Sequence, residues 1–144
     1  MPAMAARTLT VLCTLGCSLL AGAPAAFATS GTGTQNPDLT VEVSLASSAL
    51  DPDRATVGDQ VTVVERVTNN TPAVQMPRIV ETAQAPGGSP SPTTSRVRIA
   101  PHRTYRVIYS YRIFAGIPPG LSTLTLAATN GNGTSTATAE ITVI

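Results

Sequence analysis

The sequence predicts an all-β protein, an antiparallel β-sandwich of about seven strands. Three observations predict this class. Apolar and polar residues alternate with a period of two in several short stretches. Clusters of glycine, proline and asparagine separate these stretches at close intervals. No convincing helical pattern follows residue 38, and many short strands joined by such turns are typical of a β-sandwich.

The first 28 residues have the features of a signal peptide. Arg7 supplies positive charge, an apolar run follows at 8–20, and Ala26-Phe27-Ala28 offers small residues to signal peptidase. The run is too short for a membrane-spanning helix, which needs about 20 residues. We therefore expect cleavage after Ala28, a secreted, extracellular chain and no stable membrane insertion. A lipoprotein anchored at Cys17 is the alternative.

The expected mature chain lacks several reactive groups. Both cysteines lie in the signal peptide and the sequence has no lysine, which excludes thiol, thiolate-metal and Schiff-base chemistry. Nine basic residues include Arg7, so eight arginines remain against eight acidic residues. This balance predicts no general attraction to nucleic acid or membranes.

The first half of the mature chain contains three expected strands. Residues 29–37 are small and polar, and we expect a flexible lead-in before a domain that spans 38–144. Alternation predicts strands at 39–45 and 60–68. A weaker strand at 73–83 contains Pro77, which fits only at a sheet edge or a bulge.

The second half is organised around a tyrosine-rich run. A mobile loop is expected at 84–94, followed by a short strand at 95–99 that forms a hairpin with 104–113. In the latter, odd-numbered residues are mostly tyrosine or aliphatic and even-numbered residues include two arginines, which predicts a half-buried strand with a basic outer surface. Strands at 121–129 and 134–144 pair across an Asn-Gly-Asn-Gly turn.

Glu65 does not fit the alternation of its strand. It shares the inward parity of Val61, Val63 and Val67, and a buried unpaired carboxylate is costly. One interpretation is a bulge that turns Val64 inward. We favour the other, in which Glu65 lies near the open end of the sandwich with an arginine or a tyrosine hydroxyl as partner.

Three motifs resemble those of secreted bacterial Ig-like domains. They are Gly58-Asp59-Gln60-Val61-Thr62-Val63 with Val67-Thr68-Asn69-Asn70-Thr71-Pro72, then Ile99-Ala100-Pro101-His102-Arg103-Thr104, and Pro119-Gly120-Leu121-Ser122-Thr123-Leu124. The group includes the cell-adhesion-related bacterial domain, the conserved-repeat domain of bacterial surface proteins and the glycosidase-associated Ig-like domain. The resemblance covers 38–144 and implies an Ig-like sandwich. Its motifs are turn and core residues, so they specify the fold rather than a function.

The chain departs from these relatives at several positions. His102-Arg103 stands where they have Gly-Glu, so we expect this turn to avoid a glycine-only geometry. Leu121-Ser122 stands where they have an aromatic residue, and the cysteines and tryptophan of antibody domains are absent.

Residue inventory argues against catalysis and against metal or cofactor binding. His102 is the single histidine and lies in a turn, so a Ser-His-Asp triad is not expected. Asp51, Asp53 and Asp59 could be a calcium site, but we interpret them as loop caps. Without tryptophan, and with the tyrosines facing inward, no aromatic platform for sugars is expected. We therefore expect a protein that is not an enzyme and needs no cofactor.

The arginines are the strongest positive signal for binding. If 95–99 and 104–113 form a hairpin, Arg98 lies opposite Arg106 and all outward arginines share one face. The predicted binding residues are Arg66, Arg96, Arg98, Arg106 and Arg112. Such a face could hold carboxylates or phosphates, or could merely keep the sheet soluble. On the opposite sheet, Thr123, Thr125, Thr136, Thr138 and Thr142 should form a flat hydroxyl surface.

Two hypotheses of function remain. The first is an exported binding or cell-adhesion module of the bacterial cell surface that contacts a protein or an anionic cell-envelope polymer, not nucleic acid. The alternative is a passive structural or accessory domain of a secreted assembly.

Overall fold

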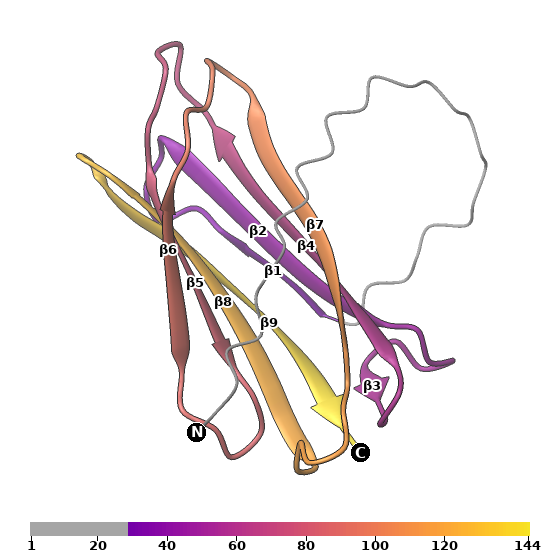
Figure 1. Ribbon diagram of the computed structural model, residues 1–144. Helices are drawn as coiled ribbons and strands as arrows, with labels where there is room; N and C mark the ends of the chain where they lie inside the picture. Colours follow the sequence, from indigo (N-terminus) through magenta and orange to yellow (C-terminus); the bar gives the residue numbers. More distant parts are fainter. Residues whose placement is uncertain (1–28) are drawn as a thin grey trace, which may run out of the picture.

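The computed structural model describes residues 29–144, and over this range the protein consists of two stacked β-sheets without a helix (Figure 1). The strands are β1 Thr29–Gly33, β2 Leu39–Ser47, β3 Arg54–Ala55, β4 Gln60–Asn69, β5 Arg78–Gln84, β6 Ser91–Arg96, β7 Thr104–Arg112, β8 Gly120–Asn130 and β9 Gly133–Val143. No helix in this range could cross a membrane. The predicted signal peptide and the Cys17 alternative lie outside the described residues.

Sheet A has the strand order β1-β2-β4-β7, and sheet B has the order β3-β9-β8-β5-β6. Their pairings are antiparallel, except that the two residues of β3 run parallel to β9. The chain therefore changes sheet repeatedly, after β4, β6 and β7 among others. These crossings decide which side chains share a face.

The core lies between the inner faces of the two sheets. Val41 and Val43 of β2 and Val61 and Val63 of β4 are almost completely buried, as the alternation predicts. They belong to one apolar cluster with Leu126 and other residues of sheet B. Burying these side chains is the main favourable term in folding. The predicted β-sandwich is therefore confirmed at the level of two packed all-β sheets.

The expected flexible lead-in at 29–37 is wrong for its first half, because Thr29–Gly33 forms β1 against β2. This strand has no apolar alternation that sequence inspection could detect. Instead, its glycines let the main chain lie directly against β9: a Cβ at Gly33 would collide with the carbonyl oxygen of Thr136, and one at Gly31 with that of Thr138.

Two further strand predictions are wrong. The third strand is β5, which lies between β8 and β6, so it is not at an edge; Pro77 comes just before it. Residues 91–94, expected in a loop, belong to β6. Every residue of β6 is exposed, so burial left no pattern in its sequence. Ile99 lies beyond β6 and bridges to Gln75.

The tyrosine-rich strand is β7, at the edge of sheet A. Its parity is as predicted, because Tyr109 and Tyr111 pack against the core and Ile108 and Arg112 are exposed. The edge position leaves the inward side incompletely covered, however, and Tyr105 keeps 36% of its surface exposed. The β8–β9 hairpin forms as predicted, with Asn130 opposite Gly133.

Asn69 holds two of the sheet crossings together. Its side-chain nitrogen, fully buried, lies 2.7 Å from the carbonyl oxygen of Ala73, 3.2 Å from that of Ile99 and 3.1 Å from that of Ala100. Its side-chain oxygen accepts hydrogen bonds from the main-chain N–H and the hydroxyl of Thr71. One amide thus joins the end of β4 to the segments that follow β4 and β6.

A second buried polar cluster fastens the β1–β2 connection to the β8–β9 hairpin. The hydroxyl of Ser135 donates to the carbonyl oxygen of Leu39 at 2.7 Å and accepts from the main-chain N–H of Asn36. The side chain of Asn36 donates to Asn130 Oδ1 and to the carbonyl oxygen of Gly133. These buried groups are paired, which keeps their burial inexpensive.

Gly33→Ala should reduce the free energy of unfolding by roughly 1–3 kcal/mol or more, because the new methyl group overlaps the β9 main chain. Gly131→Ala is the matched control, since a Cβ there meets nothing within 4 Å. Chemical denaturation of both variants measures the difference. Equal stability would contradict the close approach of β1 to β9.

Asn69→Asp should destabilise the protein by about 3 kcal/mol or more, because a carboxylate oxygen would replace the amide nitrogen among three carbonyl oxygens in a buried site. Ser89→Asp, at an exposed position in the connection between β5 and β6, controls for the added charge. Thermal melts followed by circular dichroism compare the two. Similar melting temperatures would show that Asn69 does not hold the crossings.

Candidate binding surface

The outer face of sheet A carries three of the five predicted arginines. Arg66 of β4 lies directly opposite Arg106 of β7, and Arg112 lies further along β7 opposite Gln60. The pairing of β4 with β7 brings Arg66 onto the same face as Arg106 and Arg112. Arg106 and Arg112 are exposed and Arg66 is half-buried. We call Arg66, Arg106 and Arg112 the sheet A arginines.

The other two predicted arginines lie elsewhere, which corrects the single five-arginine face. Arg96 belongs to β6 in sheet B, where it lies opposite Arg78. Arg98 follows β6 in the segment that crosses to sheet A, so it does not face Arg106. The predicted hairpin assumed that neighbouring strands in sequence pair with each other. Here they are separated, because β6 pairs with β5 and β7 pairs with β4.

Arg78, which lies opposite Arg96, is an arginine of the outer face of sheet B that is not among the five predicted residues. Its outward direction could have been read from the alternation of β5, in which Ile79 is buried. Its pairing with Arg96 depends on the register between β5 and β6, and this register could not be read from the sequence. Each outer face therefore has one pair of arginines on adjacent strands.

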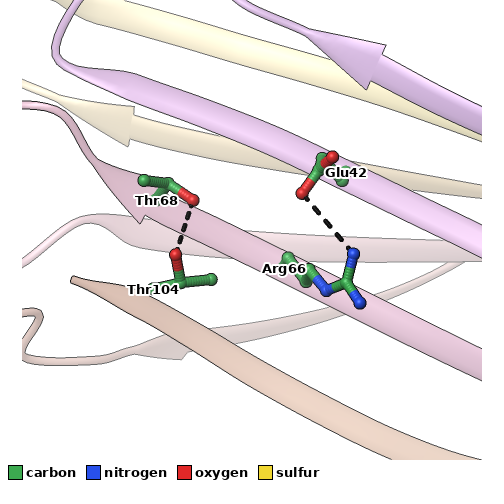
Figure 2. A network of polar contacts seen from close by, with 4 residues as sticks. All are labelled: Glu42, Arg66, Thr68 and Thr104. Carbon is green, nitrogen blue, oxygen red and sulfur yellow. Dashed lines mark hydrogen bonds and ion pairs between the residues drawn. The ribbon is translucent and has the colours of Figure 1, made fainter. Parts of the chain in front are cut away.

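Glu42 is an acidic neighbour of Arg66 (Figure 2). Its carboxylate oxygen Oε2 lies 3.9 Å from a guanidinium nitrogen of Arg66, and both side chains are about 40% exposed (42% for Arg66 and 41% for Glu42). An exposed pair at this distance contributes only about 0–1 kcal/mol. Arg66 therefore remains available to a second anion.

Short hydroxyl side chains surround the arginines. The hydroxyls of Thr68 and Thr104 lie 2.8 Å apart across β4 and β7 (Figure 2), and those of Thr62 and Ser110 lie 3.2 Å apart. Cross-strand pairs of this kind stabilise the sheet modestly. Because these hydroxyl side chains rise little above the sheet, the guanidinium groups of Arg66 and Arg106 remain accessible to solvent.

A small hollow of about 150 Å³ adjoins Arg66. Glu42, Ser44 and Val64 line it together with Gly31 and Thr32 of β1. Typical small-molecule pockets have volumes of about 300–1,000 Å³. The hollow suits one functional group, such as a carboxylate or a phosphate, rather than an enclosed ligand.

Glu65 faces inward, with 7% of its surface exposed, as the favoured interpretation predicted. The hydroxyl of Tyr109 donates to Glu81 Oε1 at 2.9 Å and lies 3.5 Å from Glu65 Oε1. A tyrosine hydroxyl is therefore a partner of Glu65, as expected. Glu65 does not lie at a strand end, because it is in the middle of β4. Three polar groups from β4, β5 and β7 thus meet between the sheets.

Burial raises the pKa of the Tyr111 phenol above its ordinary value, and a contact with the Ser122 hydroxyl partly opposes this. Tyr111 lies on β7 and Ser122 on β8, so this ring also spans the two sheets. Tyr109 and Tyr111 thus contribute to packing and hydrogen bonding between the sheets.

The acidic residues at 51–59 cap their own loops. Asp59 accepts hydrogen bonds from the main-chain N–H of Thr56, at 2.7 Å, and from its hydroxyl. These bonds hold the pKa of Asp59 below its ordinary value of 3.8, so any stabilisation they give is present above that pH and is lost as the pH falls through the lowered pKa. Asp51 accepts from the main-chain N–H of Asp53. Within residues 29–144, no three His, Cys, Asp or Glu side chains are grouped as metal ligands.

His102 is an exposed turn residue with a φ of 53°. The turn therefore uses a left-handed conformation, which is uncommon for residues other than glycine but accessible to them. This conformation is not restricted to glycine, so the turn avoids a glycine-only geometry, as expected.

The outer face of sheet B carries the predicted threonines. Thr125 and Thr138 hydrogen-bond to each other at 2.9 Å across β8 and β9. Thr129 and Thr134 do the same at 2.7 Å, and Thr136 and Thr142 also point outward. Much of this surface is therefore internally hydrogen-bonded.

No protein-family model and no curated protein matches this chain. Among solved structures, it is similar to an alkylpurine DNA glycosylase, AlkC, of Pseudomonas fluorescens bound to DNA containing an abasic site analogue, with 13% identity and a TM-score of 0.50 over 69% of this chain and 30% of that one. A Listeria innocua β-glucosidase in complex with glucose is similar at 16% identity and a TM-score of 0.45, over 72% of this chain and 16% of the enzyme. A Niemann-Pick type C2 protein of the Japanese carpenter ant has 10% identity and a TM-score of 0.40, over 67% of this chain and 88% of that one.

The chain thus spans less than a third of the glycosylase and of the glucosidase. At these identities a likeness concerns the fold alone. The Ig-like resemblance of the motifs and its functional meaning therefore remain predictions.

Tyr109→Phe should lower the free energy of unfolding by about 1–3 kcal/mol, because Glu81 and the buried Glu65 lose a hydroxyl donor while the ring is retained. Tyr105→Phe is the control, since Tyr105 is the most exposed tyrosine of β7. Urea titration of both variants provides the measurement. If Tyr105→Phe costs as much as Tyr109→Phe, the inter-sheet hydrogen bonds contribute little.

Proposed function

We propose that this protein is a secreted, non-catalytic Ig-like module that binds an anionic cell-envelope polymer or protein through the outer face of sheet A. Arg66, Arg106 and Arg112 would make the contact. The proposal narrows the predicted five-arginine face to three residues, with Arg96 and Arg98 outside the site. The domain would act as a binding or adhesion module of the bacterial surface.

The observation that carries the proposal is the direct pairing of Arg66 with Arg106. Like charges opposite each other on adjacent strands destabilise a sheet. An anion that contacts both guanidinium groups would remove this repulsion and add charge-assisted hydrogen bonds. A guanidinium group also remains charged at any physiological pH.

The surroundings of the pair suit an extended anionic partner. Glu42 neutralises Arg66 only weakly, at 3.9 Å. The neighbouring side chains are mostly short hydroxyl or aliphatic groups, and the small hollow beside Arg66 would accept one carboxylate or phosphate. Arg112, further along β7, would contact a later group of the same polymer.

The Ig-like assignment is supported by the two-sheet order and by the roles of the motif residues. Asn69, in the second half of the first motif, joins two crossings, and Asp59 in its first half caps the turn before β4. The passive accessory domain remains the alternative function, and it predicts that the arginines only keep the sheet soluble.

The test is retention on immobilised poly(glycerol phosphate) as a function of salt. Arg66→Gln combined with Arg106→Gln should weaken binding roughly 10-fold or more, because two charge-assisted contacts are lost. Arg78→Gln combined with Arg96→Gln is the matched control, since these arginines are also opposite each other but lie on sheet B. The control should lose little.

Equal losses in the two double variants would indicate a general charge effect and contradict the proposed face. Wild-type protein that passes through the column at low salt, on this polymer and on poly-glutamate, would favour the accessory domain.

A further inference from the structure

The four edge strands of the two sheets differ in how well they are protected against pairing. Among residues 29–144, these strands are β1, β3, β6 and β7. β1 has five residues and lies against β9 through its glycines, and β3 has two residues. β6 contains Pro92, which lacks an N–H donor. β7 has nine residues and contains no proline, glycine or lysine, so its main-chain groups are not blocked and its protection against pairing is the charge of Arg106 and Arg112.

The main-chain direction of β7 identifies the groups at this open edge. Ile113 donates to the carbonyl oxygen of Asp59 and accepts from Gly58, and the carbonyl oxygen of Arg103 accepts from Asn69. These groups point toward β4. The main-chain N–H and C=O groups of successive residues in a strand point to opposite sides within the plane of the sheet. Those of the even-numbered residues of β7 therefore point away from β4, toward the open edge. The outward set is Thr104, Arg106, Ile108, Ser110 and Arg112.

Exposed apolar side chains accompany this row of main-chain groups. Ile108 keeps 52% of its surface exposed and Phe114, just after the strand, keeps 66%. Tyr105, on the inner side, keeps 36%. Covering these side chains would be favourable.

We propose that β7 pairs with β7 of a second copy of this chain, antiparallel, with Ile108 opposite Ile108 at the two-fold axis. The strand runs from 104 to 112, so this register pairs all nine residues. A two-fold axis perpendicular to the sheet keeps inner and outer faces matched, as sheet continuity requires.

The sequence of β7 is complementary to itself in this register. On the inner face Tyr105 meets Tyr111 of the second copy, and Val107 meets Tyr109 of the second copy. On the outer face Arg106 meets Ser110, and Thr104 meets Arg112. No like charges are directly opposite. A shift that centres the axis on Tyr109 would place Arg106 opposite Arg112, which is unfavourable, and would shorten the ladder.

The dimer would join two four-stranded sheets into one of eight strands. Arg106 and Arg112 of both copies would then approach each other diagonally on one outer face. Salt screens this repulsion, so the dimer should strengthen as salt rises. The proposed polymer binding should weaken under the same change, so failure of one proposal can be distinguished from failure of the other.

Analytical ultracentrifugation of the secreted protein, from micromolar to millimolar concentration, tests the pairing. We expect a monomer–dimer equilibrium, and Ile108→Lys should raise its Kd at least about 10-fold by placing two charges together at the axis. Leu121→Lys is the matched control, because Leu121 is equally exposed at 50% but lies on sheet B. It should leave the Kd unchanged, and circular dichroism should show both variants folded.

A second set of variants tests the register. Ser110→Glu would face Arg106 of the second copy twice per dimer and should tighten the dimer roughly 2- to 30-fold, whereas Ser110→Lys should weaken it. Thr62→Glu adds the same charge beside Ser110 but away from the edge, since the two hydroxyls are 3.2 Å apart on adjacent strands. It should have a smaller effect than Ser110→Glu.

Three outcomes would overturn the proposal. The first is a wild-type protein that does not associate with itself at any concentration, even if it pairs with a strand of another protein. The second is a dimer that tolerates Ile108→Lys or responds equally to Leu121→Lys. The third is a dimer in which Ser110→Glu and Ser110→Lys act in the same direction.

Discussion

The fold depends on where the chain crosses from one sheet to the other, and the side chain of Asn69 fixes two of these crossings. Its amide contacts the turn after β4 and the segment after β6 at once. β5 and β6 can therefore pair with each other in sheet B, while β7 returns to β4 in sheet A. A buried amide holds such a junction well, because it has both donors and acceptors and leaves an expensive unpaired group if the junction opens.

The placement of the arginines follows from these crossings. Arg96 and Arg106 are close in sequence but lie on the outer faces of different sheets, because the chain crosses between them. Arg66 and Arg106 are far apart in sequence but lie opposite each other. A binding surface on this fold is therefore a property of strand pairing. Both sheets have an arginine pair. The sheet A pair lies inside its strands, whereas Arg78 and Arg96 are at strand ends, and it is also distinguished by Arg112 and by the adjoining hollow.

Sheet A differs strongly between its two edges. At the β1 edge, glycines bring the strand against β9 and close that side of the sandwich (Figure 1). At the β7 edge, the tyrosines are only half covered and the inward carboxyl groups of Glu65 and Glu81 share the Tyr109 hydroxyl. A polar group is tolerated between the sheets on this side because a hydroxyl donor from the edge strand reaches it. On the other side of this edge strand, Ile108 of the outer face is in contact with solvent, as is Phe114 just after the strand.

The sequence by itself determined the all-β class, the parity of β2, β4, β7, β8 and β9, and the hairpin across residues 130–133, because alternation and turn residues are local signals. It also indicated that Glu65 faces inward with an arginine or a tyrosine hydroxyl as partner, and the structure decided for the hydroxyl of Tyr109. Only the tertiary structure decided that Thr29–Gly33 and Ser91–Arg96 are strands, since an exposed or glycine-based strand leaves no apolar pattern. The tertiary structure also separated Arg96 and Arg98 from Arg66, Arg106 and Arg112. Strand partners are chosen by packing between distant segments, and no local pattern records that choice.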